Sequence, residues 1–187
     1  GDGGGDDALE RIDARVAVCA EMRALCLAIG RSWGRVAQTV GLMHELGMLG
    51  RYLPEWAALT CLVQYDAYHK FTADQHSLLA VEVLEGLGPG QGPETDELAQ
   101  IIAEVERPEL LMLGILLHDI GKALGHGHAP KGVPLIKAVT RRLNLDADDA
   151  AAVEFLVEHH LLLSHMAERR DIDDPKTIAN FAAAVET

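Results

Sequence analysis

Residues 111–122 read Leu-Met-Leu-Gly-Ile-Leu-Leu-His-Asp-Ile-Gly-Lys, and this stretch decides the fold. Only Gly114 interrupts the apolar run before the histidine, and such a run predicts a segment that is buried on all sides. The run is followed closely by an imidazole, a carboxylate and an ammonium, which belong to His118, Asp119 and Lys122. Because buried polar groups need partners, these three side chains indicate a possible site at the end of the segment.

The residue types at this end are those of a metal site. If the segment stays helical, His118 and Lys122 share a face and Asp119 lies about 100° away from His118. Adjacent His and Asp suit a divalent metal, and Lys suits an anionic oxygen. The alternative is an ordinary helix C-terminus at which the His and the Lys cap the last carbonyls. The distribution of the other histidines favours the metal site.

Composition favours an all-α fold with a single full core. The chain has 187 residues, 49% of them hydrophobic and only 4% aromatic, and its β-branched runs are short. A net charge of −13 argues against nucleic acid polymers and anionic membranes as partners. Three cysteines without a CxxC pair, together with the lack of a signal peptide or a membrane-spanning apolar run, predict a reduced, cytoplasmic protein.

The chain divides into three parts by composition. Residues 1–7 are rich in Gly and Asp and are expected to form a disordered tail. Residues 8–48 show apolar steps of three and four and predict N-terminal helices that pack on the core. Residues 49–187 form the main domain, which holds the stretch described above.

Capping residues and prolines mark the expected helices of the main domain. A helix is expected after Thr72 or Asp74, another from Pro108, and a last one from Pro175. Two further helices are expected over residues 135–143 and about 150–166. Residues 121–134 are rich in Gly, His and Pro and are expected to form a loop.

Seven candidate metal ligands are scattered over about a hundred residues, as expected when several helices point side chains into one pocket. They are His76, His118, Asp119, His128, His159, His160 and Asp171. Taken singly, each has a simpler explanation. His76 can be a surface residue of a helix, His126 and His128 can be solvated, and Asp171 can pair with a neighbouring arginine.

The order of these residues resembles the ligand set of the HD-superfamily metal-dependent phosphohydrolases. The resemblance is closest to the HD domain of the bifunctional enzymes that add uridylyl groups to PII-type proteins and remove them. It covers about residues 41–183. The sequence motifs that resemble this family lie at residues 49–55, 66–76, 118–122, 159–162 and 169–175.

This resemblance implies an HD-domain helical bundle with a metal site between helices. One divalent ion is expected on His76, His118, Asp119 and Asp171. Asp119 is expected to bridge to a second ion, held by His128 and by His159 or His160. Mn, Fe and Zn all fit such mixed nitrogen and oxygen ligands. The predicted catalytic residues are Asp119 and Lys122, and the predicted substrate contacts are Asp66, Tyr68, His69 and Arg170.

The implied activity is metal-dependent phosphodiester hydrolysis, with release of UMP from a uridylylated PII-type protein. The alternatives are hydrolysis of a free nucleotide or cyclic dinucleotide, a di-iron oxygenase, and a non-catalytic metal-binding sensor or scaffold. The sequence departs from the family at Gly127, where Asp is usual, at Ala129-Pro130, where Ser-Glu is usual, and at Tyr65, where His is usual. No uridylyl-transferring activity is expected from this chain.

Overall fold

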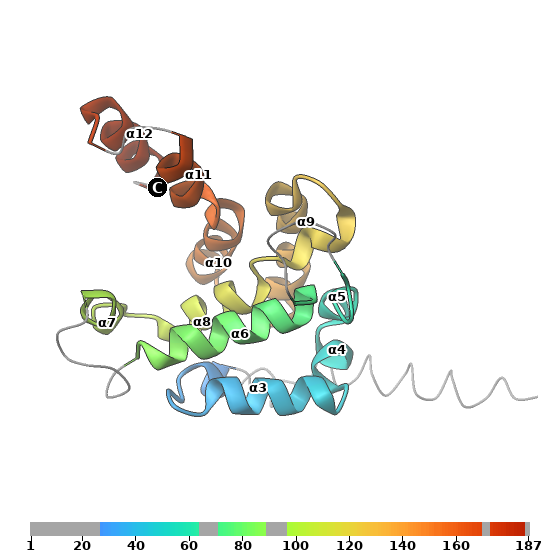
Figure 1. The fold of residues 1–187 in the computed structure, drawn as a ribbon. Helices are drawn as coiled ribbons and strands as arrows, with labels where there is room; N and C mark the ends of the chain where they lie inside the picture. The colour runs from blue at the N-terminus through green and yellow to red at the C-terminus, as the bar shows by residue number, and fades with distance from the viewer. Residues whose placement is uncertain (1–26, 64–70, 89–96, 170–172, 186–187) are drawn as a thin grey trace, which may run out of the picture.

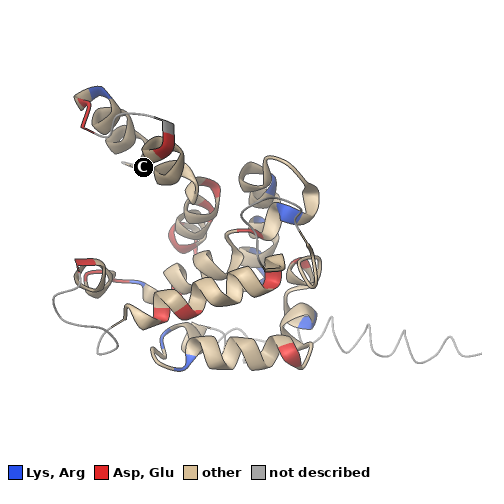
Figure 2. Cartoon of the chain, in the orientation of Figure 1, with Lys and Arg blue, Asp and Glu red and all other residues tan. Residues whose placement is uncertain are grey.

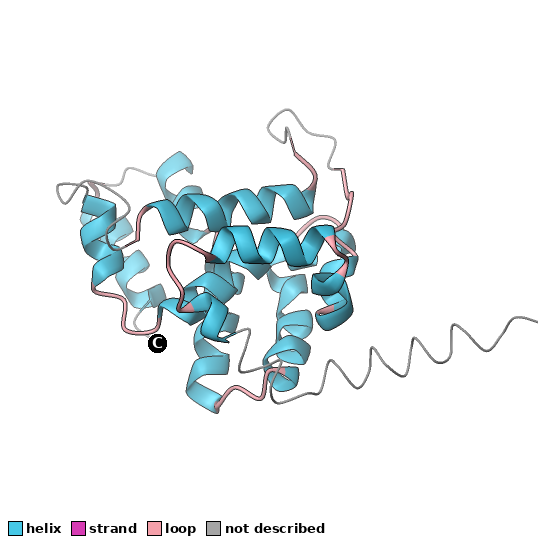
Figure 3. Ribbon diagram, turned by 90° about the horizontal axis from the view of Figure 1, so that it is seen from below, coloured by secondary structure: helices cyan, strands magenta, loops and turns pink. Residues whose placement is uncertain are grey.

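The computed structural model describes residues 27–63, 71–88, 97–169 and 173–185, and it is built of helices throughout these ranges (Figure 1). Figure 3 shows helices and loops, without a strand, in the same part of the chain, so the predicted all-α class is confirmed. The helices are, in chain order, α3 (Val36–Glu45), α4 (Met48–Tyr52), α5 (Pro54–Ala57), α6 (Ala73–Gly86), α7 (Glu97–Ala103), α8 (Pro108–Leu117), the 3-10 helix η1 (Ile120–Leu124), α9 (His128–Arg142), α10 (Ala147–His159), α11 (Leu162–Arg169) and α12 (Pro175–Val185).

The apolar run that precedes His118 forms α8, the central helix. Pro108 occupies its first turn, where a missing N–H costs no hydrogen bond. α8 packs against α6 and α10, and Leu110 and Leu117 are buried in the shared core. A Cβ built on Gly114 would lie 2.9 Å from Leu156 Cδ1, so glycine lets α8 and α10 approach closely. The predicted burial of this segment is confirmed.

α3 is tied to α6 by a buried carboxylate. Glu85 of α6 accepts hydrogen bonds from the backbone N–H of Val36 at 2.6 Å and of Ala37 at 3.1 Å. These are N–H groups of the first turn of α3, which has no side-chain cap of its own. Beyond α3, Tyr52 of α4 and Trp56 of α5 are 2% and 0% exposed, so these two aromatic residues are core anchors.

The predicted loop over residues 121–134 is wrong, because η1 and the first half of α9 occupy it. Gly127 precedes α9 with a φ of 72°, a left-handed conformation that glycine adopts without strain. Pro130 then falls in the first turn of α9, where its missing N–H is not needed. Pro134 lies inside the helix. Gly127 and Pro130 therefore mark the start of a helix rather than a loop, and the helix accommodates Pro134 in its interior.

The expected helix from about residue 150 to 166 is instead two helices, α10 and α11. Asp146 caps α10, since its side chain accepts a hydrogen bond from Asp149 N at 2.8 Å. α12 starts at Pro175, as predicted, and Asp174 accepts a hydrogen bond from Lys176 N at 3.3 Å. In Figure 1, α11 and α12 extend from the end of α10.

Acidic residues mark α6, α7 and α10 in Figure 2, whereas basic residues are most visible on α9. Lys137 of α9 and Glu154 of α10 form an ion pair between these two helices, with Nζ 3.6 Å from Oε2. None of the described helices is long and apolar enough to cross a membrane. The predicted tail over residues 1–7 lies outside the described residues, and the predicted boundary between residues 48 and 49 stays a prediction.

Candidate metal centre

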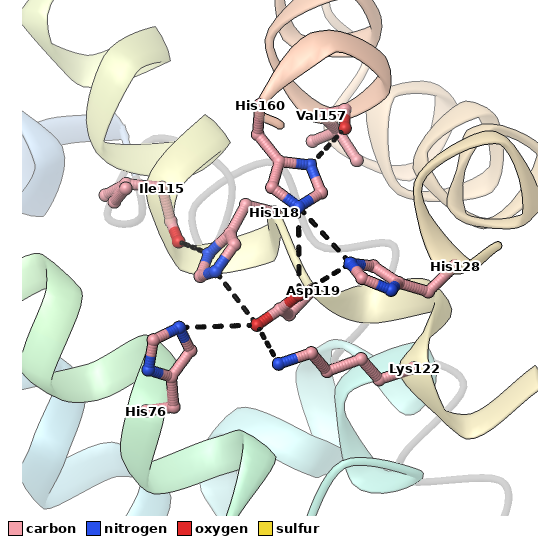
Figure 4. Close-up of polar contacts among 8 residues, drawn as sticks. All are labelled: His76, Ile115, His118, Asp119, Lys122, His128, Val157 and His160. Carbon is pink, nitrogen blue, oxygen red and sulfur yellow. Dashed lines mark hydrogen bonds and ion pairs between the residues drawn. The ribbon is translucent and has the colours of Figure 1, made fainter. Parts of the chain in front are cut away.

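Asp119 lies at the centre of a cluster of histidines that four elements build (Figure 4). Its Oδ2 atom lies 2.9 Å from His118 Nε2 and 3.5 Å from His76 Nε2. Its Oδ1 atom lies 3.0 Å from His128 Nε2 and 3.8 Å from His160 Nε2. Each oxygen of the carboxylate therefore faces one pair of imidazoles.

The histidines reach Asp119 from different parts of the chain. His118 immediately follows α8, and His76 lies in the first half of α6. His128 is the first residue of α9, and His160 follows the last residue of α10. Helix ends thus direct most of these side chains, and the cluster exists only when the helices are packed together.

Lys122 is the buried cation of the cluster. Its Nζ atom lies 2.7 Å from Asp119 Oδ2, and the two side chains are 4% and 2% exposed. The condition under which His118 and Lys122 would share a helix face is not met, because α8 ends at Leu117 and a 3-10 turn follows. This turn brings the ammonium back to the carboxylate three residues earlier, so Lys122 lies against Asp119.

Gly121 allows η1 to lie directly against the start of α9. A Cβ at this position would lie 2.1 Å from the carbonyl oxygen of His128 and 2.8 Å from Gly132 N. Both neighbours are backbone atoms that cannot move aside without shifting α9. The sequence analysis missed this role. The sequence offered only a slight signal, a glycine placed between Ile120 and Lys122 at the end of the apolar run.

The donor set fits a divalent cation, as two backbone contacts indicate. His118 Nδ1 lies 2.7 Å from the carbonyl oxygen of Ile115, and His160 Nδ1 lies 2.7 Å from that of Val157 (Figure 4). A carbonyl only accepts, so each Nδ1 carries a proton that it donates. In the neutral rings the Nε2 lone pairs then point toward the Asp119 carboxylate. Lone pairs that converge on an anion are a ligand arrangement for a cation.

Two groups of side chains have the spacing of metal ligands. His76, His118 and Asp119 form one group, and Asp119, His128 and His160 form the other. Within each group the ligand atoms lie within 4.8 Å of one another. Because Asp119 belongs to both groups, the residues fit one ion or a carboxylate-bridged pair.

The surroundings keep Asp119 ionised. Burial alone would raise the pKa of its carboxyl, but in the metal-free protein the hydrogen bonds that His118, His128 and Lys122 donate to it outweigh burial and hold the pKa well below its usual range. Burial lowers the pKa of His160, which favours the neutral imidazole that binds metals. Both pKa shifts favour the forms that bind metals, an ionised carboxylate and a neutral imidazole.

The remaining predicted site residues lie apart from the cluster or outside the described residues. His159 contacts the ring of Phe155, with ring centroids 4.7 Å apart, and belongs to neither ligand group. His126 is exposed in the turn before α9. The other predicted site residues lie outside the described residues: Asp66, Tyr68, His69, Arg170 and Asp171. Their roles stay predictions.

The fold and this cluster agree with a family match. Residues 73–186 match the HD domain family, so the chain belongs to that family, and its predicted class, an HD-superfamily metal-dependent phosphohydrolase domain, is confirmed. HD domains bind divalent metals, which agrees with the donor set described here.

Named relatives show which HD-domain enzymes the chain resembles. The chain is 36% identical over 181 residues to the bifunctional uridylyltransferase/uridylyl-removing enzyme of Ruegeria pomeroyi, covering 96% of this chain and 20% of the relative. It is 38% identical over 162 residues to the enzyme of the same name from Phenylobacterium zucineum, covering 86% and 17%. The corresponding enzyme of Thiobacillus denitrificans is 36% identical over 176 residues, covering 94% and 21%. The chain therefore spans about a fifth of the length of these relatives.

Proposed function

We propose that this chain hydrolyses a phosphodiester in a divalent-metal-dependent reaction, and that the reaction is the removal of a uridylyl group from a protein. The observation that carries the proposal is the buried carboxylate of Asp119, which has a pair of imidazoles at each oxygen and an ammonium beside it. The likeness to uridylyl-removing enzymes over most of the chain supports the choice of substrate.

The proposed ligands follow the two oxygens of Asp119. His76 and His118 would hold one ion together with Asp119, and His128 and His160 would hold the other with the same carboxylate. His160 is preferred to His159 because only His160 belongs to a ligand group. Asp171 remains a proposed further ligand of the first ion. Mn, Fe and Zn all suit this set of nitrogen and oxygen donors.

The bound metal supplies Lewis acidity that polarises the phosphoryl oxygens and activates water. Asp119 is ionised and buried, so it holds its position and its charge through the reaction. Lys122 has its ammonium at the same carboxylate oxygen as His118. From there it neutralises the negative charge that builds up on the phosphoryl group in the transition state.

The substrate enters beside His76. Its side chain is 39% exposed, whereas those of His118 and His160 are 10% and 12% exposed, so the His76 side of the cluster is the more open one. Residues 66–72 precede α6, the helix that carries His76. We propose that Asp66, Tyr68 and His69 of this segment contact the uridylylated tyrosine, together with Arg170.

The altered residues before and after His128 do not remove it from the cluster, so the set of donors that metal-dependent hydrolysis needs is retained. Gly127 takes a left-handed conformation and Ala129 is buried in the first turn of α9. With these residues in place, His128 Nε2 still lies 3.0 Å from Asp119 Oδ1.

The test is metal analysis followed by a substrate assay. Purified protein is analysed for Mn, Fe and Zn, loaded with Mn²⁺, and incubated with a uridylylated PII-type protein, and the product is weighed by mass spectrometry. Parallel reactions contain a free nucleotide, a cyclic dinucleotide and bis-p-nitrophenyl phosphate. An Asp119→Asn variant is the control for contaminating hydrolases.

We expect the protein substrate to lose the mass of one UMP moiety only with wild-type protein and metal. If the free or cyclic nucleotide is hydrolysed while the protein keeps its UMP, the proposed substrate is wrong and the nucleotide replaces it. Metal-loaded protein that hydrolyses none of these compounds would reject the hydrolase proposal and favour a sensor or scaffold. Oxygen consumption by the iron-loaded form would point to the oxygenase alternative.

A further inference from the structure

The first turn of α6 carries His76 but lacks a side-chain cap. Thr72 occupies the N-cap position and makes no capping hydrogen bond with its side chain. The His76 N–H donates to the carbonyl oxygen of Thr72 at 2.8 Å, so it belongs to the first hydrogen bonds of the helix. First turns fray easily when they are not capped. The position of the His76 ring therefore depends on whatever else holds this turn.

A chain of three side chains holds the turn from the opposite side. Trp56 Nε1 donates a hydrogen bond to His44 Nδ1 at 3.2 Å, and His44 Nε2 lies 3.1 Å from Asp74 Oδ2. The backbone N–H of Cys61 donates to the same Asp74 oxygen at 3.1 Å. We call these three side chains the Trp56–His44–Asp74 array. They come from α5, from the last turn of α3 and from the first turn of α6.

The hydrogen-bond directions in the array are fixed by its first member. An indole N–H can only donate, so His44 Nδ1 must accept, and in the neutral ring the proton lies on Nε2. Nε2 then donates to Asp74. The array is also well buried, since Trp56 is 0% and Asp74 is 2% exposed, while the His44 side chain is 12% exposed. A buried, directional chain of this kind fixes the distance between α3, α5 and the start of α6.

Asp74 and His76 lie on opposite sides of the same turn. Two residues along an α-helix correspond to about 200° of rotation, so a side chain at Asp74 points away from one at His76. Asp74 accordingly contacts His44, whereas His76 faces Asp119 and the ring of His118, whose centroid is 5.2 Å away. Holding Asp74 therefore sets where His76 lies.

We propose that His44, Trp56 and Asp74 are positioning residues for the metal centre, which hold the His76 imidazole at its place beside Asp119. This inference rests on the proposed function, because it takes His76 as a metal ligand. It assigns a role in the site to residues of α3 and α5, which contribute no ligand themselves. Loss of the array should lower the affinity for the ion that His76 and His118 would hold. The affinity for the ion that His128 and His160 would hold should stay unchanged.

The test compares variants that remove one interaction each with a matched control. Trp56→Phe keeps an aromatic ring and removes the N–H donor. His44→Leu removes both ring nitrogens, and His44→Gln returns a donor near the position of Nε2. Gln75→Ala is the control, because Gln75 is an exposed neighbour in the same turn of α6.

The first readout needs no metal. Hydrogen exchange of the His76 amide is measured by NMR in chelator-treated protein, and we expect it to be about tenfold faster in His44→Leu, a factor that corresponds to about 1.4 kcal/mol. It should return toward the wild-type rate in His44→Gln and stay unchanged in Gln75→Ala. The second readout is Mn²⁺ titration by calorimetry. We expect one binding event to weaken about tenfold or more in His44→Leu and Trp56→Phe while a second event keeps its affinity.

Two results would overturn the inference. One is a His44→Leu protein whose His76 amide exchange and Mn²⁺ binding match those of Gln75→Ala. The other is faster exchange with unchanged Mn²⁺ affinity, which would make the array structural only. If circular dichroism shows that His44→Leu does not fold, Trp56→Phe decides the question by the same two readouts. Failure of the proposed function is recognised separately, since it would appear in wild-type protein as a lack of metal or of UMP release.

Discussion

Replacing Asp119 by Asn tests the centre of the site without changing the size of the side chain. The amide lacks the negative charge that a bridging ligand needs, so both groups of histidines lose their common anion. We expect the variant to lose its transition metal and its hydrolytic activity. Metal content is measured by mass spectrometry of the purified variant beside wild type.

The same substitution should destabilise the metal-free protein by a predictable amount. The Lys122 ammonium lies 2.7 Å from the carboxylate and is 4% exposed, so Asp119→Asn leaves a buried ammonium beside a neutral amide. Breaking a buried ion pair from one side typically costs about 3–5 kcal/mol of the free energy of unfolding. Replacing both partners by neutral groups is often close to neutral. Asp119→Asn combined with Lys122→Met should therefore regain most of that loss.

The assay is urea unfolding in the presence of a chelator at pH 7, for wild type, both single variants and the double variant. At this pH the carboxylate is ionised, because its pKa lies below its usual range. A coupling energy of about 2 kcal/mol or more between the two sites is expected. Lys122→Met alone should keep its metal and lose turnover. The reasoning is refuted if Asp119→Asn keeps both its metal and its stability, or if the two substitutions are simply additive.

Three further predictions concern His128, Gly121 and Glu109. His128→Ala should lower metal content or activity more than tenfold, over about 1.4 kcal/mol, whereas His126→Ala, at an exposed position, should be mild; the reverse order in metal analysis would contradict the ligand assignment. Gly121→Ala should lower both stability and metal affinity, since a Cβ would lie 2.1 Å from the His128 carbonyl oxygen; normal Mn²⁺ titration and thermal unfolding would contradict this. Burial opposes ionisation of Glu109, but its bonds to Arg31 and a second arginine lower its pKa to about 2. A lowered folded-state pKa gives stability that is present above the ordinary value of 4.5 and lost as pH falls toward 2. Glu109→Gln should flatten that acid dependence in denaturation curves, and an unchanged acid dependence would refute it.

Elements of the fold that depend on residues close together in the sequence could be predicted. Elements that depend on contacts between distant residues could not. α8 was predictable because its residues from Leu110 to Leu117 are apolar except for Gly114, and because Pro108 marks its first turn. The start of α12 was predictable because Asp174 and Pro175 are local cap signals. The second half of α9 was expected as a helix over residues 135–143, but its first half was missed because Pro130 and Pro134 were counted as breakers. Whether a proline breaks a helix or begins one depends on where the first turn falls.

The ligand set shows the same limit at the level of single residues. His159 and His160 are adjacent, and no periodicity separates them. The structure separates them because α10 ends at His159, so that His160 turns toward Asp119 while His159 contacts Phe155. The order of motifs along the chain could supply the candidates, but only the packed ends of helices could choose between neighbours.

The same reasoning explains why α3 matters to a centre whose ligands all follow residue 73. Glu85 caps α3 near its start, and Asp74 contacts His44 near its end, so α3 and α6 hold each other at both ends. Neither contact is visible in a local pattern, because the partners are 49 and 30 positions apart along the chain. A family match that begins at Ala73 therefore marks where the ligands begin. The part of the fold that we propose to hold those ligands in place extends further, to α3 and α5.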